Sequence, residues 1–130
     1  MTALLDGNVL IALAFSEHSH NASAQRWLPT VSRFATCPTV QGALLRFLVR
    51  QGFRPATGLL GLRAILDLER HEQWFDDLTY AQVDLSRMLG HAQVTDAYLA
   101  QLARSRGGRV ATFDRGFAAS APDVVDLLTA

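Results

Sequence analysis

Short apolar segments with the character of β-strands alternate along this chain with longer segments whose apolar residues recur at helical spacing. The segments that predict strands are Thr2–Leu5, Arg33–Cys37, Arg109–Phe113 and Val124–Leu127, and His71–Thr79 fits either a short strand or a loop. The segments that predict helices are Val9–Phe15, Ala22–Leu28, Thr39–Arg50, Thr57–Glu69, Gln82–Leu89 and Val94–Arg104. Because parallel strands need helical crossovers, this alternation predicts an α/β fold, a parallel β-sheet flanked by helices on both faces.

The length and composition of the chain fit one such domain. The chain has 130 residues, of which 49% are hydrophobic and 18% are charged, so we expect a single folded domain over residues 1–130. The apolar run Val9–Phe15 is too short to span a bilayer, and no export signal is recognisable. Cys37 is the only cysteine, which suits a reducing compartment and a buried structural role. We therefore expect a cytoplasmic protein with no membrane association.

Three aspartates lie where an apolar segment gives way to a helix or a loop. Asp6 follows the first predicted strand, Asp114 follows Arg109–Phe113, and Asp96 lies in the first turn of the helix that leads into that strand. Functional groups of open parallel sheets gather beyond the carboxyl ends of the strands, so the three carboxylates can meet at one edge. Carboxylates this close retain protons at neutral pH unless a cation neutralises them. The pattern predicts a site for Mg²⁺ or Mn²⁺, which can activate a water for phosphodiester cleavage.

Each of these aspartates also has a purely structural interpretation. Asp6 can begin a turn, Asp96 can stabilise a helix N-terminus, and Asp114-Arg115-Gly116 can form an ordinary turn. His18 and His20 have the spacing of a metal-binding pair, but no cysteine or further histidine completes a zinc site. The structural interpretations explain each aspartate alone but do not explain why all three end up at comparable places in the predicted fold.

The motifs around the three aspartates, taken in order, resemble those of the PIN-domain ribonucleases, in particular the VapC toxins of bacterial toxin–antitoxin pairs. The segments that carry the resemblance are Met1–Leu13, Val94–Ala100 and Val110–Phe117, and His18 and His20 before Trp27 resemble a subgroup of these toxins. Each motif alone is weak, but the ordered set spans essentially the whole chain.

This resemblance implies a Mg²⁺-dependent endoribonuclease that acts as the toxin of a toxin–antitoxin pair. Asp6 and Asp96 would be the main metal ligands, Asp114 a further catalytic acid, and Asn8 and Thr112 supports of these acids. It also implies an RNA substrate, a VapB-type antitoxin and a homodimer. The family usually has a glutamate early in its third helix, where this chain has Gln41, Gly42 and Ala43. With three acids instead of four, the site could hold one metal ion or two. The alternative function also stays open: a degenerate PIN domain that binds RNA or a protein without cleavage.

The positive charges offer candidate contacts to RNA. All twelve cationic side chains are arginine, and they balance twelve acidic side chains. Receiver and dehalogenase-like phosphoryl-transfer domains, which also place an aspartate after the first strand, need a lysine near the phosphoryl group. The absence of lysine from the sequence therefore argues against these two functions. Arg115 follows Asp114 directly and is expected in the substrate groove. Other candidates are Arg46, Arg50 and Arg54 along or just beyond one helix, and Arg104, Arg106 and Arg109 near the last two acids. The apolar faces of Thr39–Arg50 and Thr57–Glu69 predict either ordinary core packing or a groove for an amphipathic inhibitor segment.

Overall fold

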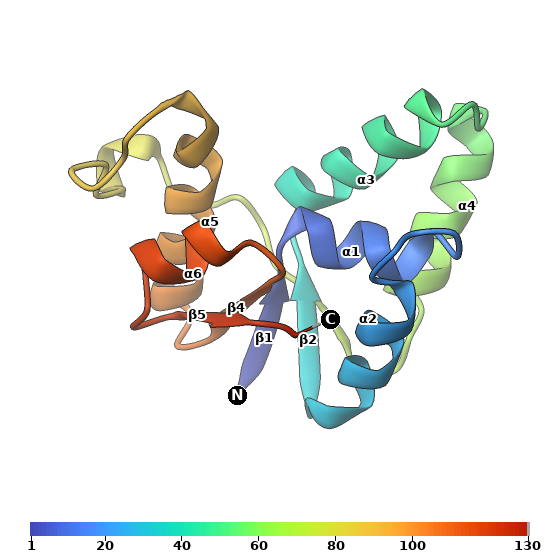
Figure 1. Cartoon of the computed structure of the whole chain (residues 1–130), viewed down its shortest axis with the longest axis horizontal. Helices are drawn as coiled ribbons and strands as arrows, with labels where there is room; N and C mark the ends of the chain where they lie inside the picture. The colour runs from blue at the N-terminus through green and yellow to red at the C-terminus, as the bar shows by residue number, and fades with distance from the viewer. Residues whose placement is uncertain (130) are drawn as a thin grey trace.

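The computed structural model describes residues 1–129, which form a parallel sheet with helices between the strands (Figure 1). The strands are β1 (Thr2–Leu5), β2 (Arg33–Thr36), β3 (His71–Gln73), β4 (Arg109–Thr112) and β5 (Val125–Leu127). The helices are α1 (Gly7–Ala14), α2 (Asn21–Trp27), α3 (Pro38–Arg50), α4 (Pro55–Leu66), α5 (Val94–Ser105) and α6 (Arg115–Ser120), with short 3₁₀ turns η1 (Leu28–Thr30), η2 (Tyr80–Gln82) and η3 (His91–Gln93). Helices α1 to α4 lie on one side of the sheet and α5 and α6 on the other, so the predicted α/β class is confirmed.

The strand order reverses at β1, in the middle of the sheet: β2 and β3 are added on one side of it, and β4 and β5 on the other. The order is β3-β2-β1-β4-β5, and every neighbouring pair is parallel. Leu5 pairs with Ala111, and the Asp6 N–H donates to the Ala111 carbonyl at 3.0 Å, which extends the β1–β4 ladder to Asp6. In open parallel sheets, ligands bind beyond the carboxyl ends of the strands at such a reversal. The fold thus directs attention to the loops that follow β1 and β4.

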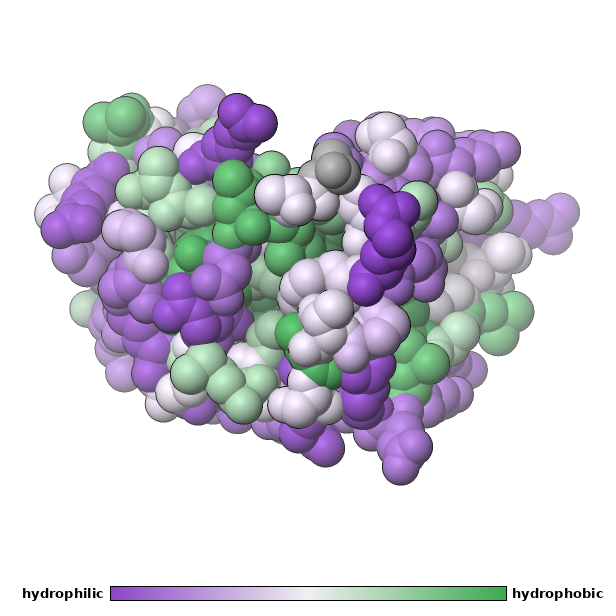
Figure 2. All heavy atoms as spheres, turned by 60° about the horizontal axis from the view of Figure 1, so that its bottom comes forward, coloured by the Kyte–Doolittle hydropathy of each residue, from purple (hydrophilic) through white to green (hydrophobic). Residues whose placement is uncertain are grey.

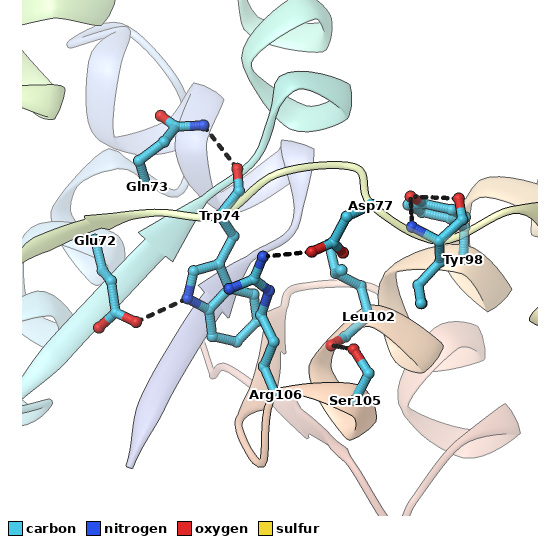
Figure 3. A network of polar contacts seen from close by, with 9 residues as sticks. Glu72, Gln73, Trp74, Asp77, Tyr98, Leu102, Ser105 and Arg106 are labelled. Carbon is cyan, nitrogen blue, oxygen red and sulfur yellow. Dashed lines mark hydrogen bonds and ion pairs between the residues drawn. The ribbon is translucent and has the colours of Figure 1, made fainter.

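The core is built from apolar side chains of the sheet and of the helices on both sides. Trp74, which follows β3, is among the largest buried side chains, at 2% exposure. Figure 3 shows its indole between Glu72, which accepts a hydrogen bond from Nε1 at 2.9 Å, and the guanidinium of Arg106, 5.2 Å from the ring centroid. A Cβ added at Gly108 would lie 2.7 Å from both Trp74 Cη2 and the Thr2 carbonyl, so this turn before β4 requires glycine.

The surface combines polar regions with gathered apolar side chains. On the face in Figure 2, polar side chains surround a hollow in which apolar side chains collect. Exposed apolar residues also lie on the outer side of α3 and α4, among them Val49 at 45% exposure and Leu60 at 64%. No helix in residues 1–129 has the length and apolar character that crossing a membrane requires.

One predicted helix is absent. Residues 82–89 contain only the end of the turn η2, and the rest is irregular. The side chains of Thr79 and Gln82 cap that single turn reciprocally, and Asp84 Oδ1 accepts from the Ser86 N–H at 2.9 Å, a local bond that competes with helix formation. Leu89 is 92% exposed, so this segment lacks the tertiary packing on which short helices depend.

Four helix starts also differ from prediction, that of α2 by one residue, and one helix was not predicted. The first helix is capped by Asp6 rather than Asn8, because the Asp6 carboxylate accepts from the Gly7 N–H at 2.7 Å. Helices α3 and α4 begin at Pro38 and Pro55, ahead of the predicted starts at Thr39 and Thr57, since proline suits the first helical position. The unpredicted helix is α6, which follows Asp114 directly.

Candidate active site

Asp6 lies at the junction of β1 and α1, and both of its carboxylate oxygens are engaged. Oδ1 accepts from the Gly7 N–H at 2.7 Å, and Oδ2 accepts from the Thr112 hydroxyl at 2.7 Å. Burial raises the pKa of Asp6, and the charge of Asp114 raises it further, while the two hydrogen bonds oppose this shift. Each oxygen accepts only one bond from these residues, so lone pairs remain for another ligand.

Thr112, the last residue of β4, connects the loop after β1 to the loop after β4. Its buried hydroxyl donates to Asp6 and accepts from Asn8 Nδ2 at 3.1 Å and from the Asp114 N–H at 3.0 Å. The other end of the Asn8 amide, Oδ1, accepts from the Phe113 N–H at 3.1 Å. Thr112 therefore contacts both Asp6 and the Asp114 backbone, whereas Asn8 acts one step away, through Thr112 and Phe113.

Asp114 serves as the N-cap of α6. Its Oδ1 accepts from the N–H groups of Gly116 at 2.8 Å and Phe117 at 3.2 Å. The interpretation of Asp114-Arg115-Gly116 as an ordinary turn is wrong, because a helix begins there, but capping this helix is still a structural role of Asp114. This role does not exclude a second one, because within residues 1–129 the other carboxylate oxygen, Oδ2, accepts no hydrogen bond and the side chain is exposed.

Asp96 approaches this cluster from α5, on the other side of the sheet from α1. It lies in the first turn of the helix, half-buried, and none of its oxygens has a hydrogen-bond partner among the described residues. Burial and, to a smaller extent, the charges of Asp6 and Asp114 together raise its pKa from 3.8 to about 6. The three predicted acids are therefore close enough to repel one another.

The donor set fits a hard divalent cation through two carboxylates. Within residues 1–129, no group of three or more His, Cys, Asp or Glu side chains is close enough to hold one ion. Mg²⁺ does not need such a group, because it is usually bound by one or two carboxylates and keeps several waters. Burial, with the charges of Asp6 and Asp114, raises the pKa of Asp96, and a bound cation would stabilise its charged form.

Known proteins with similar sequences identify the family. The model of the PIN domain family matches residues 3–121. Ribonuclease VapC29 of Mycobacterium tuberculosis is 50% identical over 129 residues, which cover 98% of this chain and 97% of that protein. This chain belongs to the VapC family of PIN-domain ribonucleases. Ribonuclease VapC39 of the same organism is 38% identical over 131 residues, covering 93% and 94% of the two chains.

Two solved VapC structures have the same fold. VapC20 of Mycobacterium tuberculosis, described as a toxin that cleaves the sarcin-ricin loop, aligns with a TM-score of 0.75 over 99% of this chain and 100% of that chain, at 16% identity. VapBC2 of Rickettsia felis, bound to a DNA fragment from its promoter, aligns with a TM-score of 0.69 over 99% and 100%, at 15% identity. At these identities the likeness shows the fold of this VapC-family chain and nothing about its substrate.

Three of the arginines considered as phosphate contacts are occupied by ion pairs. Arg104 pairs with Asp123 at 2.8 Å, Arg106 with Asp77 at 3.0 Å, and Arg109 with Asp126 at 2.8 Å. These exposed ion pairs compete with phosphate for the three guanidinium groups, so these arginines are weaker candidates for RNA contacts than an unpaired one. Arg115 differs from them. It is exposed at the start of α6 and has no ion pair in the described part of the chain.

Gln41 lies in the segment where the resemblance leads us to expect a glutamate. Its Nε2 donates to the Thr36 hydroxyl at 2.9 Å and to Gln73 Oε1 at 2.8 Å. A carboxylate has no hydrogen to donate, so a glutamate could not make these two bonds. In this VapC-family chain, Gln41 therefore links the carboxyl ends of β2 and β3.

Sequence reasoning missed one side chain that packs beside the acids. The sequence offered His20 as half of a possible zinc pair and as part of the family resemblance, but it did not predict that its ring stacks on Phe113, the residue between Thr112 and Asp114. The zinc interpretation is not supported, because no metal-binding group of three side chains exists in residues 1–129. No signal in the sequence could reveal the stack, since 92 intervening residues connect the two rings and only the fold brings them together.

Proposed function

We propose that this protein is a Mg²⁺-dependent endoribonuclease and the toxin of a toxin–antitoxin pair, active in the cytoplasm. The observation that carries the proposal is the connection of Asp6 through Thr112 to the loop of Asp114, opposite Asp96, whose pKa is raised to about 6. Membership of the VapC ribonuclease family supports this chemistry. Mn²⁺ has a similar preference for oxygen ligands and is expected to substitute for Mg²⁺.

Asp6 and Asp96 are the proposed metal ligands, and Asp114 is the proposed third acid. Thr112 and Asn8 hold Asp6 and the backbone before Asp114 in one orientation, so the carboxylates do not have to rearrange when RNA binds. A bound Mg²⁺ would activate water and stabilise the charge that develops on the phosphodiester. Arg115 is the proposed contact to a neighbouring phosphate, since its guanidinium is exposed and next to Asp114.

The proposed protein partner is a VapB-type antitoxin. A pocket of about 500 Å³ lies between the end of α1 and the helices α3 and α4, and its lining includes Phe15, Leu48, Phe53, Gly58 and Gly61. An amphipathic antitoxin segment could insert apolar side chains there. We also propose that the protein is a homodimer. Exposed apolar side chains lie on the outer side of α3 and α4, and such a surface is commonly buried in an interface with another protein chain.

Cleavage of RNA by the purified protein tests the activity directly. Addition of Mg²⁺ should start cleavage, EDTA should stop it, and Asp96→Asn should remove it. The same protein should melt at a higher temperature with Mg²⁺ than without it, and Asp96→Asn should lose most of this rise because a ligand carboxylate is gone. A metal-dependent rise in melting temperature without cleavage would favour the alternative, a degenerate PIN domain that binds RNA or a protein.

A further inference from the structure

Three rings form a stack beside the candidate active site. The imidazole of His20 lies almost parallel to the ring of Phe113, with 4.4 Å between the centroids and 11° between the planes. The ring of His18 follows at 5.7 Å from His20, tilted by 38°. His20 is therefore the middle ring of this stack, and Phe113 is the ring nearest to the acids.

His20 is held in this place from its own side of the molecule. Its backbone N–H donates to His18 Nδ1 at 3.0 Å, which closes a tight turn. Helix α2, which begins at the next residue, is tied to the end of α1 by two side chains: Asn21 Nδ2 donates to the Ala12 carbonyl at 2.8 Å, and Gln25 Nε2 donates to the Leu13 carbonyl at 3.2 Å. The imidazole of His20 thus belongs to the residue before a helix whose start is fixed by hydrogen bonds to α1.

Phe113 passes this constraint to the acids. It stands between Thr112, whose hydroxyl binds Asp6, and Asp114, whose N–H binds the same hydroxyl. Its own N–H donates to Asn8. A shift of the Phe113 ring would therefore move the backbone on which both Thr112 and Asp114 depend.

The surroundings of the His20 ring nitrogen Nδ1 indicate that the flat shape of the ring, rather than its hydrogen bonding, is what matters for its contact with Phe113. Nδ1 is buried and has no hydrogen-bond partner among the described residues. A buried nitrogen without a partner lowers stability, so the hydrogen-bonding capacity of Nδ1 does not explain its position. The flat face of the ring does, because it matches the face of Phe113.

We propose that His20 is a positioning residue of the nuclease: its imidazole, stacked on Phe113, fixes the β4–α6 loop and thereby Thr112 and Asp114. This assignment rests on the proposed ribonuclease function. His20 touches neither the acids nor the reacting atoms and acts only through Phe113.

Three variants separate stacking from other roles. His20→Ala removes the ring and should lower kcat for RNA cleavage about tenfold or more, with KM nearly unchanged, because displaced catalytic groups slow the chemical step. His20→Phe keeps a flat ring and removes the unpartnered nitrogen, so it should retain kcat and melt above the wild type. His18→Asn is the matched control: it removes the outer ring but keeps an acceptor for the His20 N–H, and it should cleave like the wild type.

Backbone amide NMR of the metal-free protein provides a readout that does not depend on cleavage. In His20→Ala the amide signals of Phe113 and Asp114 should shift, and in His20→Phe they should stay near their wild-type positions. Full activity of His20→Ala, or a loss of activity in His20→Phe equal to that in His20→Ala, would overturn the proposal, as would unmoved amide signals in His20→Ala. If the wild type does not cleave RNA, the proposed function fails while the amide signals still decide the positioning role.

Discussion

Asp96 differs from the other two acids in having no hydrogen-bond partner among the described residues. Asp6 and Asp114 each accept a hydrogen bond from an N–H group of the helix that follows. Asp96 has only burial and two neighbouring negative charges, all of which raise its pKa. Its carboxylate is therefore the one whose ionisation most opposes folding when no cation is present.

This difference predicts an unusual dependence of stability on pH. Between pH 3.8 and about pH 6, Asp96 holds a proton in the folded protein that it has lost in the unfolded chain. The free energy of unfolding therefore falls as the pH rises through this window. Melting temperatures of the metal-free protein should decrease over this range, and Asp96→Asn should make the decrease shallower. The idea is wrong if both proteins show the same pH dependence in EDTA, where no metal masks the repulsion.

Arg115 carries a second prediction for a single side chain. Arg115→Ala should weaken RNA binding at low salt and reduce the slope of log K against log salt by about one, because one phosphate contact is lost. Its melting temperature should hardly change, since the side chain is exposed and unpaired in the described structure. Binding titrations over a series of salt concentrations measure this.

The matched control for this experiment is Arg109→Ala. It removes the same charge from a guanidinium that already pairs with Asp126 at 2.8 Å. Its salt slope should remain that of the wild type. An equal reduction in both variants would show that net charge, and not a contact of Arg115, governs binding.

At the scale of elements, the packing of α3 and α4 against the end of α1 leaves the pocket that we assign to the antitoxin. Gly61 of α4 lines this pocket, and a Cβ added there would meet no atom within 4 Å. Gly61→Leu should therefore fold and project into the pocket. It should also stabilise α4, because glycine inside a helix costs roughly 0.5–1 kcal/mol relative to alanine.

Gly61→Leu should weaken binding of a VapB-type antitoxin and leave RNA cleavage intact. Calorimetric titration with the antitoxin and a cleavage assay on the same preparation test both statements. Gly61→Ala is the control, since it gains the helix preference but fills little of the pocket. Tight binding of the antitoxin to Gly61→Leu would place its docking surface elsewhere.

The sequence predicts these elements well where periodicity and packing agree. The strand Thr2–Leu5 is confirmed residue for residue, and the ends of β2 and β4 differ by one residue from the predictions. Predictions failed where side-chain hydrogen bonds, local in residues 82–89 and distant at Asn8, compete with the pattern. Asn8 has the sequence signature of a helix cap, but its amide binds Thr112 and Phe113, which are more than a hundred residues away in sequence. The placement of the three aspartates after β1, in α5 and after β4 could be predicted from the sequence. The ion pairs of Arg104, Arg106 and Arg109 could not, because their partners lie 17 to 29 residues away and only the fold brings them together.

The whole molecule gives a prediction for living cells. Expression of this chain alone should slow growth, and Asp6→Ala should relieve the effect because a proposed metal ligand is lost. Asp6→Asn is the sharper variant, because an asparagine still offers an oxygen to the Gly7 N–H and serves well as a helix cap. Growth curves with matched protein levels and circular dichroism of the purified variants check this. Arrest that persists in a folded Asp6→Asn protein would exclude metal chemistry as its cause.

The position of β1 in the middle of the sheet has a consequence for how the protein is made. Asp6 leaves the ribosome at the start of synthesis, but the hydroxyl that orients it belongs to Thr112, 106 residues later. Pairing of β1 with β4 must wait until that strand emerges, as is usual for sheets dominated by distant contacts. A nascent chain, or one cut short before β4, lacks both Thr112 and Asp114. A cell that makes such a nuclease is thus exposed to it only after nearly the entire polypeptide has been translated.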